Sequence, residues 1–463
     1  MQEDQNDSSF SDPRKVECAV VGAGLAGLTA SATLRRAGVS TVTIDGHDPG
    51  GRASTVERDG FRLNQGPHAL YNAGLAMREL TALGLRPRGV TPPVEQTQIL
   101  RNGSLHAMPL TVRSLATSKV LDRQGRTAAL RVLPRLQRGR DRAAHGLTVS
   151  EWLERRRVPG DLRAMIEMLI RLTTYSNSPD VMSAEAALAQ FALGGNGVIY
   201  LDDGWSQLVD ALSVDLSIVR REVTEVRRDG SKWVVLRADG EAIAVADSVI
   251  VASGGPATAA RLVGRDPGWT ESAGPECRAA VLDLGVAPAP RSPIVLSVDD
   301  PLYGSTHSPS ARLAPEGHSL ISAMRYLRPH EEHDRDITRS ELGDHARRMG
   351  GEPATAIVDR YLHRMVTASG TPLADRRRPH GAELAADGLW AAGDWVAPDV
   401  PGGEHALLAD AAVGSGAAAA RAVARQRERT VAAGPATEAV PIWSTCSRPS
   451  GDGSVGSRIA CSA

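Results

Sequence analysis

The chain has 463 residues, of which 42% are hydrophobic, and a formal net charge of −1. This length leaves room for two domains with cores of their own, and the small net charge excludes a general attraction to nucleic acid. The four cysteines are scattered and form no C-x-x-C pattern, which argues against a disulfide framework or a metal site and favours a cytoplasmic location. We expect no signal peptide in residues 1–13 and no membrane-spanning segment.

Residues 16–52 carry the most informative pattern. In a dinucleotide-binding unit, Gly22 would allow the tight turn, Gly24 would let backbone N–H groups approach a pyrophosphate, and Gly27 would bring helix and strand together. Asp45 stands where a carboxylate accepts the ribose hydroxyls of an adenosine. The elements expected around these residues are a strand over 16–21, a helix over 28–37 and a strand over 41–44. This order favours dinucleotide binding over the alternative, a purely structural glycine turn.

The remaining elements follow from turn signals and apolar periodicity. Asn102-Gly103 is a type I′ turn signal, so strands at 98–100 and 105–107 are expected to form a hairpin. The other predicted elements are helices over 149–157, 162–173 and 338–349, strands over 279–284, 294–298 and 320–326, and a final alanine-rich helix ending near residue 424. From Arg427 onward Ser, Thr, Gly and Pro dominate, which predicts a disordered tail.

Residues 113–142 form a strongly basic segment with interleaved aliphatic side chains. Leu130, Val132, Leu133 and Leu136 alternate with arginines, which is typical of a helix that docks on anionic lipid. The alternative is a solvated face of an ordinary helix. Nucleic-acid binding is not expected, because no aromatic residue stands among the arginines.

Further segments resemble the motifs of a known family: Gly50-Gly51-Arg52, 60–68, 203–208, 222–226 with 248–253, and 388–394. They are similar to those of the FAD-dependent amine oxidase, protoporphyrinogen oxidase and phytoene desaturase superfamily, and the likeness covers residues 16 to about 424. The resemblance implies an α/β fold, with a Rossmann-like FAD-binding domain of the GR2 type and a discontinuous α+β substrate or cap domain. The cofactor implied is FAD, and non-covalent binding is expected because no Cys or His lies in an obvious attachment motif.

The resemblance also implies domain boundaries and cofactor contacts. The expected segments are 16–93, 203–265 and 380–426 for the FAD-binding domain, 94–202 and 266–379 for the cap domain, and 1–15 and 427–463 for disordered termini. In the family, the residue matching Val223 meets the adenine through its backbone, and the final helix points its N-terminus at the pyrimidine end of the flavin. The cofactor-binding residues expected are Gly22, Ala23, Gly24, Ala26, Gly27, Asp45, Gly51, Arg52, Gly66, Pro67, Val223, Ala252, Gly393, Asp394, Gly403 and His405.

Two departures from the family bear on the reaction. Amine oxidases of this fold carry a lysine near flavin N5, but this chain has no lysine after Lys232. They also enclose the amine between aromatic rings, whereas alignment of the final helix puts Leu408 at one aromatic position. The sequence therefore favours dehydrogenation of an uncharged, apolar, terpenoid or polyketide-like small molecule of secondary metabolism. Hydride would pass directly to flavin N5. Amine oxidation is the alternative within the same chemistry.

His68 is the titratable side chain that the resemblance places near the flavin ring. It is a candidate catalytic base, because its pKa ordinarily lies near neutrality, and the alternative is a structural histidine bonded to a backbone carbonyl. The substrate cavity is expected to be mostly apolar. Its expected lining from the cap helices is Met165, Ile166, Leu169, Leu172 and Phe191. The rival interpretation places these five residues in the cap's own core.

Other functions of this fold stay open at this point. Flavin-dependent cyclases and isomerases share it, as do flavin-free lipid-binding escort proteins, although the intact FAD motifs argue against the flavin-free class. The terminal electron acceptor is expected to be O2, a quinone or NAD(P). The expected location is the cytoplasm, with peripheral membrane contact through residues 113–142 as an open possibility.

Overall fold

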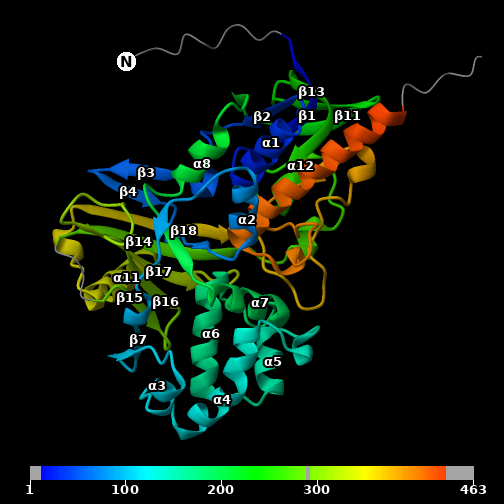
Figure 1. Cartoon of the computed structure of the whole chain (residues 1–463). Coiled ribbons are helices and arrows are strands. Elements are labelled where there is room, and N and C mark those ends of the chain that lie inside the picture. The colour runs from blue at the N-terminus through cyan, green and yellow to red at the C-terminus, as the bar shows by residue number, and fades with distance from the viewer. Residues whose placement is uncertain (1–11, 288–291, 434–463) are drawn as a thin grey trace, which may run out of the picture. The chain divides into compact units, whose positions relative to one another are not determined.

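The computed structural model describes residues 12–287 and 292–433 (Figure 1). Most of the predicted disordered termini lies outside these described residues. Where the two overlap, the predicted boundaries are slightly wrong, because the first strand already begins at Arg14 and the last helix continues to Ala433. The chain up to Ala424 forms one compact unit, and the rest forms a second. Every element discussed below belongs to the first unit, apart from the end of that last helix.

The first sheet is the nucleotide-binding sheet that the sequence predicts. Its strand order is β10-β2-β1-β13-β12-β11, with β19 added beside β13. The central pairs β2–β1, β1–β13 and β13–β19 are parallel, which places Val21 and Val251 side by side where β1 and β13 end. The strands are β1 (Arg14–Val21), β2 (Thr41–Asp45), β10 (Ile218–Arg220), β11 (Glu225–Asp229), β12 (Lys232–Leu236), β13 (Ala242–Val251) and β19 (Leu389–Ala391).

Helices cover both faces of this sheet. On one face, α1 (Leu25–Arg36) and α12 (Leu408–Ala433) pack through small and aliphatic residues such as Ala30, Leu34 and Ala420. On the other face, α9 (Pro256–Leu262) and α10 (Trp269–Ser272) contribute Leu262 and Trp269. The strand–helix–strand order of β1, α1 and β2 confirms the predicted unit. It brings the carboxyl ends of the parallel strands to one edge, where ligands of such sheets bind.

A second sheet has the order β18-β14-β17-β16-β15-β7-β8. Its strands are β7 (Thr97–Arg101), β8 (Ser104–Ala107), β14 (Cys277–Val286), β15 (Ile294–Ser297), β16 (Leu302–Ser308), β17 (Ser319–Leu327) and β18 (Val358–Ala368), and α11 (Arg335–Met349) covers one face. The predicted hairpin is confirmed, since Asn102 and Gly103 adopt φ of 50° and 74°. Strands β16 and β18 are not predicted from the sequence. Gly and Ser interrupt β16, and β18 contains the charged residues Asp359, Arg360 and Arg364, so neither has a simple apolar pattern.

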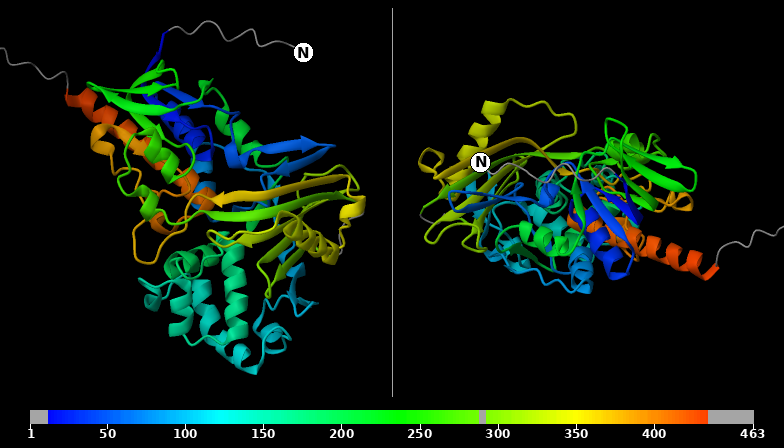
Figure 2. Two further views of the ribbon diagram at one scale, coloured as in Figure 1. Left: turned by 180° about the vertical axis from the view of Figure 1, so that it is seen from behind. Right: turned by 90° about the horizontal axis from the view of Figure 1, so that it is seen from above.

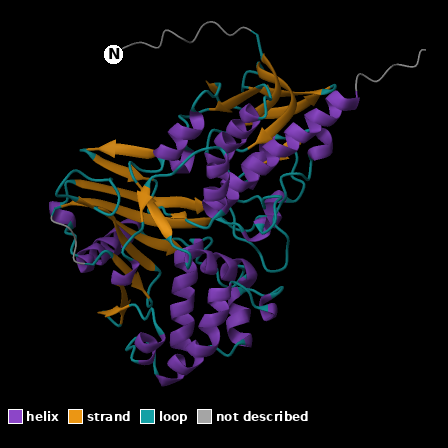
Figure 3. Cartoon of the chain, viewed as in Figure 1, coloured by secondary structure: helices purple, strands orange, loops and turns teal. Residues whose placement is uncertain are grey.

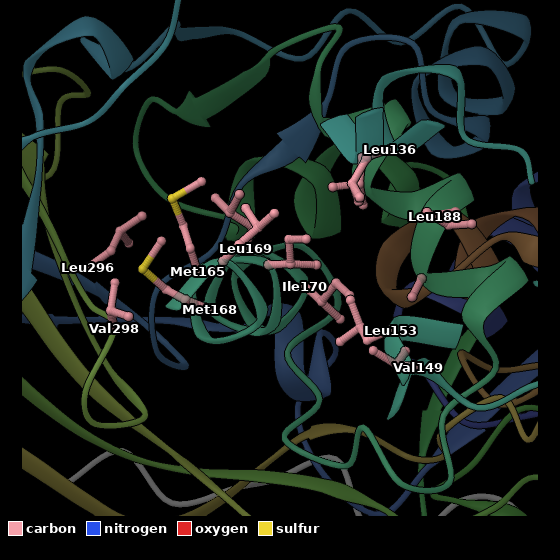
Figure 4. Close-up of a cluster of buried hydrophobic side chains, with 14 of the residues drawn as sticks. Leu136, Val149, Leu153, Met165, Met168, Leu169, Ile170, Leu188, Leu296 and Val298 are labelled. Carbon is pink, nitrogen blue, oxygen red and sulfur yellow. The ribbon is translucent and has the colours of Figure 1, made fainter. Parts of the chain in front are cut away.

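The opposite face of the second sheet packs against a layer of helices. These are α3 (Val112–Ala116), α4 (Arg123–Arg138), α5 (Val149–Arg155), α6 (Gly160–Thr174) and α7 (Ala184–Gly194). Figures 1, 2 and 3 show α4–α7 at the end of the unit opposite to β1 and β13. Figure 4 shows Met165 and Leu169 of α6 among aliphatic side chains of the neighbouring helices and of the second sheet. The predicted helices over 149–157 and 162–173 are therefore confirmed.

The apolar residues predicted to line a cavity belong to the core of this helical layer or pack against it instead. Met165, Ile166 and Leu169 are buried in it, and Leu172 and Phe191 pack against it. The rival interpretation of these five residues is thus the correct one. The apolar stripe of an amphipathic helix packs against the elements that hold the helix in place.

The basic segment uses its apolar residues in the same way. Val132 and Leu136 are buried and Leu133 packs against the same core, whereas Leu130 is 56% exposed. The aliphatic face that lipid docking would need is mostly used for packing, and peripheral membrane contact stays a prediction. Among the helices of the described residues, none is long and apolar enough to span a membrane.

Short elements complete the unit between the two sheets. These are the hairpin of β3 (Thr55–Arg58) and β4 (Phe61–Asn64), the small sheet of β5 (Leu70–Tyr71), β9 (Val198–Leu201) and β6 (Gly89–Val90), and the helices α2 (Leu75–Ala82) and α8 (Ser206–Ser213). The chain between β4 and β5 contains His68, so the hairpin and the small sheet fix both ends of the segment that carries it.

Candidate functional site

The glycine turn after β1 contains glycines with two different roles. Gly22 has φ +110°, and a Cβ there would lie 2.6 Å from the carbonyl oxygen of Ala252. A Cβ on Gly27 would lie 1.8 Å from the oxygen of Gly22. These two glycines are therefore required by the fold itself. Gly24 is different, because its φ of −76° suits any residue and a Cβ there would meet no atom within 4 Å. The protein leaves open space over Gly24.

That open space belongs to a pocket of about 510 Å³. The pocket begins at the carboxyl ends of β1 and β2, passes the loop after β13 and the segment after β19, and reaches the β4–β5 loop. Its volume lies in the range of small-molecule and cofactor sites. The sequence-predicted residues that line it are Gly22, Gly24, Ala26, Asp45, Gly51, Arg52, Pro67, His68, Ala252, Gly393 and Asp394.

The other predicted residues lie just outside the lining. Ala23 donates its backbone N–H to Asp45, and Gly66 accepts a hydrogen bond from His68. Val223 is partly buried between β10 and β11, against the core of the nucleotide sheet. Gly403 and His405 form a short 3₁₀ helix ahead of α12, which itself begins at Leu408. At that end the pocket is lined instead by Leu408, Ala409 and Ala412.

Asp45 is held at the edge of the pocket by backbone donors. Its Oδ2 accepts the N–H of Ala23 at 2.6 Å, and its Oδ1 accepts the N–H of His47 at 2.9 Å. Each carboxylate oxygen can accept more than one hydrogen bond, so capacity is left for hydroxyl groups of a ligand. The side chain is 23% exposed, which leaves the carboxylate accessible from the pocket.

Arg52 and Asp394 form a two-pronged ion pair across the middle of the pocket. The distances are 2.7 Å from Nη1 to Oδ2 and 2.8 Å from Nη2 to Oδ1, and Ser369 donates its backbone N–H to the same carboxylate at 2.9 Å. Burial alone would raise the pKa of the Asp394 carboxyl, but the guanidinium and the hydrogen bonds hold that pKa below its usual value. Asp394 is therefore a fixed negative charge, and Arg52, with its side chain 40% exposed, turns its remaining surface to the pocket.

His68 stands at the opposite end of the pocket from Asp45. Its Nδ1 lies 2.8 Å from the carbonyl oxygen of Gly66, and its ring packs on Trp205 with centroids 5.1 Å apart. The pKa of His68 is lowered to about 4, chiefly by burial and also by Arg52 and Arg360, against the raising effect of the Gly66 bond. The imidazole is therefore neutral near neutral pH, with the proton on Nδ1 donated to Gly66. Nε2 makes no hydrogen bond to the residues that the structure describes.

Arg360, which is partly buried, and Arg378, which is buried, hold the loops that form this end. Arg360 of β18 pairs with Asp283 of β14 and donates to the carbonyl oxygen of Asn64, just before the His68 segment. Arg378 donates to the carbonyl oxygens of Asp394 and Ala406, which fixes the chain that leads into α12. Burial lowers the pKa of Arg378 to about 10, so it keeps its charge at neutral pH. Both arginines fix the loops around the site, and neither lines the pocket.

Several lining residues were not predicted from the sequence. Tyr175 ends α6 with a left-handed φ of 58°, and Met365 lies on β18, a strand that the apolar pattern did not indicate. Thr258 and Glu276 come from the chain after β13 and before β14. No local motif marks these positions. Met365 reaches the pocket through the pairing of the second sheet, and Thr258 through the packing of α9 on the nucleotide sheet.

The fold and the pocket define a dinucleotide-binding flavoprotein, and the comparison with known families agrees. Residues 25–424 match the family of flavin-containing amine oxidoreductases, so the chain belongs to that family. It is an FAD-dependent oxidoreductase. The open space over Gly24 fits the pyrophosphate of that cofactor, and the adjacent carboxylate of Asp45 fits the hydroxyl groups of its ribose.

Short stretches of the chain resemble two curated proteins. It is 44% identical over 68 residues to a phytoene dehydrogenase of Streptomyces griseus, which is 14% of this chain and 13% of that protein. It is 36% identical over 66 residues to a phytoene desaturase of Cercospora nicotianae, 14% of this chain and 11% of the other. The matched stretches thus span only a small part of each relative.

Solved structures of the same fold cover nearly the whole chain. An oxidoreductase from Methanosarcina mazei has a TM-score of 0.67 at 18% identity, covering 86% of this chain and 98% of its own. The cyclohexylamine oxidase of Brevibacterium oxydans has a TM-score of 0.66 at 15% identity, covering 89% and 100%. A reduced UDP-galactopyranose mutase has a TM-score of 0.64 at 14% identity, covering 90% and 96%. At these identities the likeness establishes the fold, and the chemistry has to be argued from the site.

Proposed function

We propose that the chain dehydrogenates an uncharged small molecule with non-covalently bound FAD. FAD supplies, when bound, the acceptor for a hydride at flavin N5. The observation that carries the proposal is the continuous pocket from Gly24 and Asp45, past the Arg52–Asp394 pair, to the neutral His68. The segments that converge on this pocket are those whose motifs resemble the FAD motifs of the family.

Different residues along the pocket bind different parts of the cofactor. Gly24 leaves room for the pyrophosphate, Asp45 accepts the ribose hydroxyls, and Arg52 with Asp394 holds the centre of the cofactor. Leu408 and the small residues Ala409 and Ala412 line the pocket where α12 begins. We assign to them the contact with the cofactor that the sequence suggested for Gly403 and His405. Because α12 begins here, its N-terminus favours negative charge at that end.

His68 is the residue we assign to proton transfer. Dehydrogenation removes a hydride and a proton from the substrate, and Nε2 of the neutral imidazole has a free lone pair to accept the proton. The bond from Nδ1 to Gly66 fixes the ring and its tautomer, so the structural interaction and the catalytic role are compatible.

Two alternatives share the fold. Amine oxidation is supported by the cyclohexylamine oxidase likeness. However, the chain has no lysine beyond Lys232, and Leu408 borders the pocket at the position that aligns with an aromatic residue of amine oxidases. The second alternative is a non-redox reaction, which the likeness to UDP-galactopyranose mutase supports. The stretches similar to phytoene dehydrogenase and desaturase favour dehydrogenation of an apolar, terpenoid-type substrate. O2, a quinone or NAD(P) would then reoxidise the cofactor.

Simple amines are expected not to reduce the holoenzyme. Without the lysine and the aromatic position of amine oxidases, the pocket lacks the groups that orient a free amine for hydride loss. The measurement is the absorbance of bound FAD after anaerobic mixing with cyclohexylamine, putrescine and benzylamine, with photochemical reduction as the control that the flavin is redox-active. Rapid bleaching by one of these amines would contradict the proposal in favour of amine oxidation.

A further inference from the structure

The first turn of α12 lines the pocket with a strained backbone. Leu408, Ala409 and Ala412 all border the pocket, and Leu408 has a left-handed φ of 54°. This conformation brings the Cβ of an L-residue too close to the backbone, so side chains other than glycine, asparagine and aspartate rarely adopt it. Such strain persists only where the surrounding contacts hold the chain in place. The contacts at the start of α12 therefore decide whether this wall of the pocket keeps its shape.

Asp410, in the same turn, joins the start of α12 to α2. Figure 1 shows α2 beside this end of α12, and Oδ1 of Asp410 accepts the backbone N–H of Ala76, in the first turn of α2, at 2.7 Å. The backbone N–H of Asp410 bonds to the carbonyl oxygen of Leu407 at 3.0 Å. Leu408 thus lies between two residues that are bonded to each other, and one of them is fixed to a neighbouring helix.

Gly74, just before α2, leaves the space that the Asp410 carboxylate occupies. The backbone at Gly74 has φ −76° and ψ 162°, which any residue can adopt. A Cβ there would lie 2.3 Å from Oδ1 and 2.6 Å from Oδ2 of Asp410, and its three nearest atoms would all belong to that side chain. The lack of a side chain at this position is therefore matched to the carboxylate and not to the local backbone.

The Asp410 carboxylate is costly to bury. The residue is 2% exposed, and its Oδ2 has no hydrogen-bond partner among the described residues. Burial raises the pKa of the carboxyl to about 6, although the bond from Ala76 and the charge of Arg78 lower it. A buried carboxylate with one printed donor does not repay its desolvation through stability alone. Its place behind the wall of the cofactor pocket suggests a role in binding.

We propose that Asp410 is a positioning residue for FAD: its bond to α2 holds Leu408 in the left-handed conformation and so keeps the wall of the cofactor site in place. Asp410 does not line the pocket, so it acts through Leu408, Ala409 and Ala412, which do. The inference rests on FAD binding and is independent of the substrate. Its test is therefore a measurement on the cofactor alone.

The first test measures how fast FAD leaves the holoenzyme, through the rise in flavin fluorescence after dilution. Asp410→Ala is expected to speed release about tenfold, the scale of losing one helix-capping hydrogen bond. Asp410→Asn should restore most of the wild-type rate, because its amide oxygen can still accept the N–H of Ala76.

Glu79→Gln is the matched control, because it breaks a second link between the same two helices. Glu79 of α2 pairs with Arg421 of α12 at 2.7 Å, and neither residue lines the pocket. The variant is expected to lower the melting temperature of the holoenzyme and to leave the rate of FAD release unchanged. An unchanged release rate in Asp410→Ala, or an equal acceleration in Glu79→Gln, would overturn the inference.

The second test moves the Asp410 carboxylate without changing Asp410. Gly74→Ala is expected to speed FAD release as Asp410→Ala does, because the added methyl group would displace the carboxylate from Ala76. In the double variant the methyl group has room, so release should be no faster than in Asp410→Ala alone. A wild-type rate in Gly74→Ala, or additive acceleration in the double variant, would overturn the inference. A wild-type chain that binds no FAD would overturn it together with the proposed function.

Discussion

Gly24→Val is expected to abolish FAD binding while the protein stays folded. The backbone at Gly24 accepts any residue, and a side chain there would meet no protein atom within 4 Å. The branched side chain would instead fill the space where the pyrophosphate approaches the turn, at the N-terminus of α1. The measurement is the FAD content of the purified variant, together with its circular dichroism and its melting temperature without cofactor.

Two other glycines supply matched controls. Gly160→Val adds the same side chain at a helix start outside the pocket, where a Cβ also meets nothing within 4 Å, and full FAD content is expected. Gly22→Val should prevent folding, because its Cβ would strike Ala252 and its φ is +110°. If Gly24→Val retained a full complement of FAD, the turn would have only a structural role.

His68→Ala is expected to slow substrate-dependent reduction of FAD by about 10²–10⁴-fold, the usual contribution of a general base, while FAD stays bound. The rate is measured by anaerobic stopped-flow absorbance. His318→Ala is the matched control, because His318 makes the same kind of bond, from Nδ1 to the carbonyl oxygen two residues earlier, away from the pocket. An unchanged rate in His68→Ala would make His68 a packing residue and leave hydride transfer to positioning alone.

The pH dependence of the same rate tests the state of His68. Its base form is the neutral one, and burial lowers the pKa to about 4, so the base is fully present near neutral pH and is lost as the pH falls through that value. The rate should therefore be flat from about pH 6 to 8 and decline only in stronger acid, whereas an unperturbed histidine would give a midpoint near 6.5. A midpoint near 6.5 that disappears in His68→Ala would contradict the buried geometry described above.

The local motifs were sufficient to predict the first strand–helix–strand unit of the nucleotide sheet. The order of β1, the glycine turn, α1, β2 and Asp45 is dictated by residues that are close in sequence, and the hairpin at Asn102-Gly103 follows from turn chemistry alone. The apolar spacing of α6 likewise predicts its helix. It could not tell which partner the apolar stripe meets, because a core and a cavity wall have the same composition.

The substrate end of the site depends on contacts distant in sequence. Met365 reaches the pocket from β18 and Tyr175 from the end of α6, so no window of the sequence contains the signal. The start of α12 shows the same limit: Gly403 and His405, which were expected to bind the cofactor, lie in a 3₁₀ helix, and α12 begins only at Leu408. Boundaries of this kind are set by packing rather than by local preference.

The most direct measurement of the central claim is the flavin content of the purified protein before and after acid precipitation. We expect a yellow protein with one FAD per chain, released in full into the supernatant because the Arg52–Asp394 pair and the glycine turn hold it without a covalent bond. A colourless protein that cannot be reconstituted with FAD would contradict the account, and flavin that stays with the precipitate would contradict non-covalent binding.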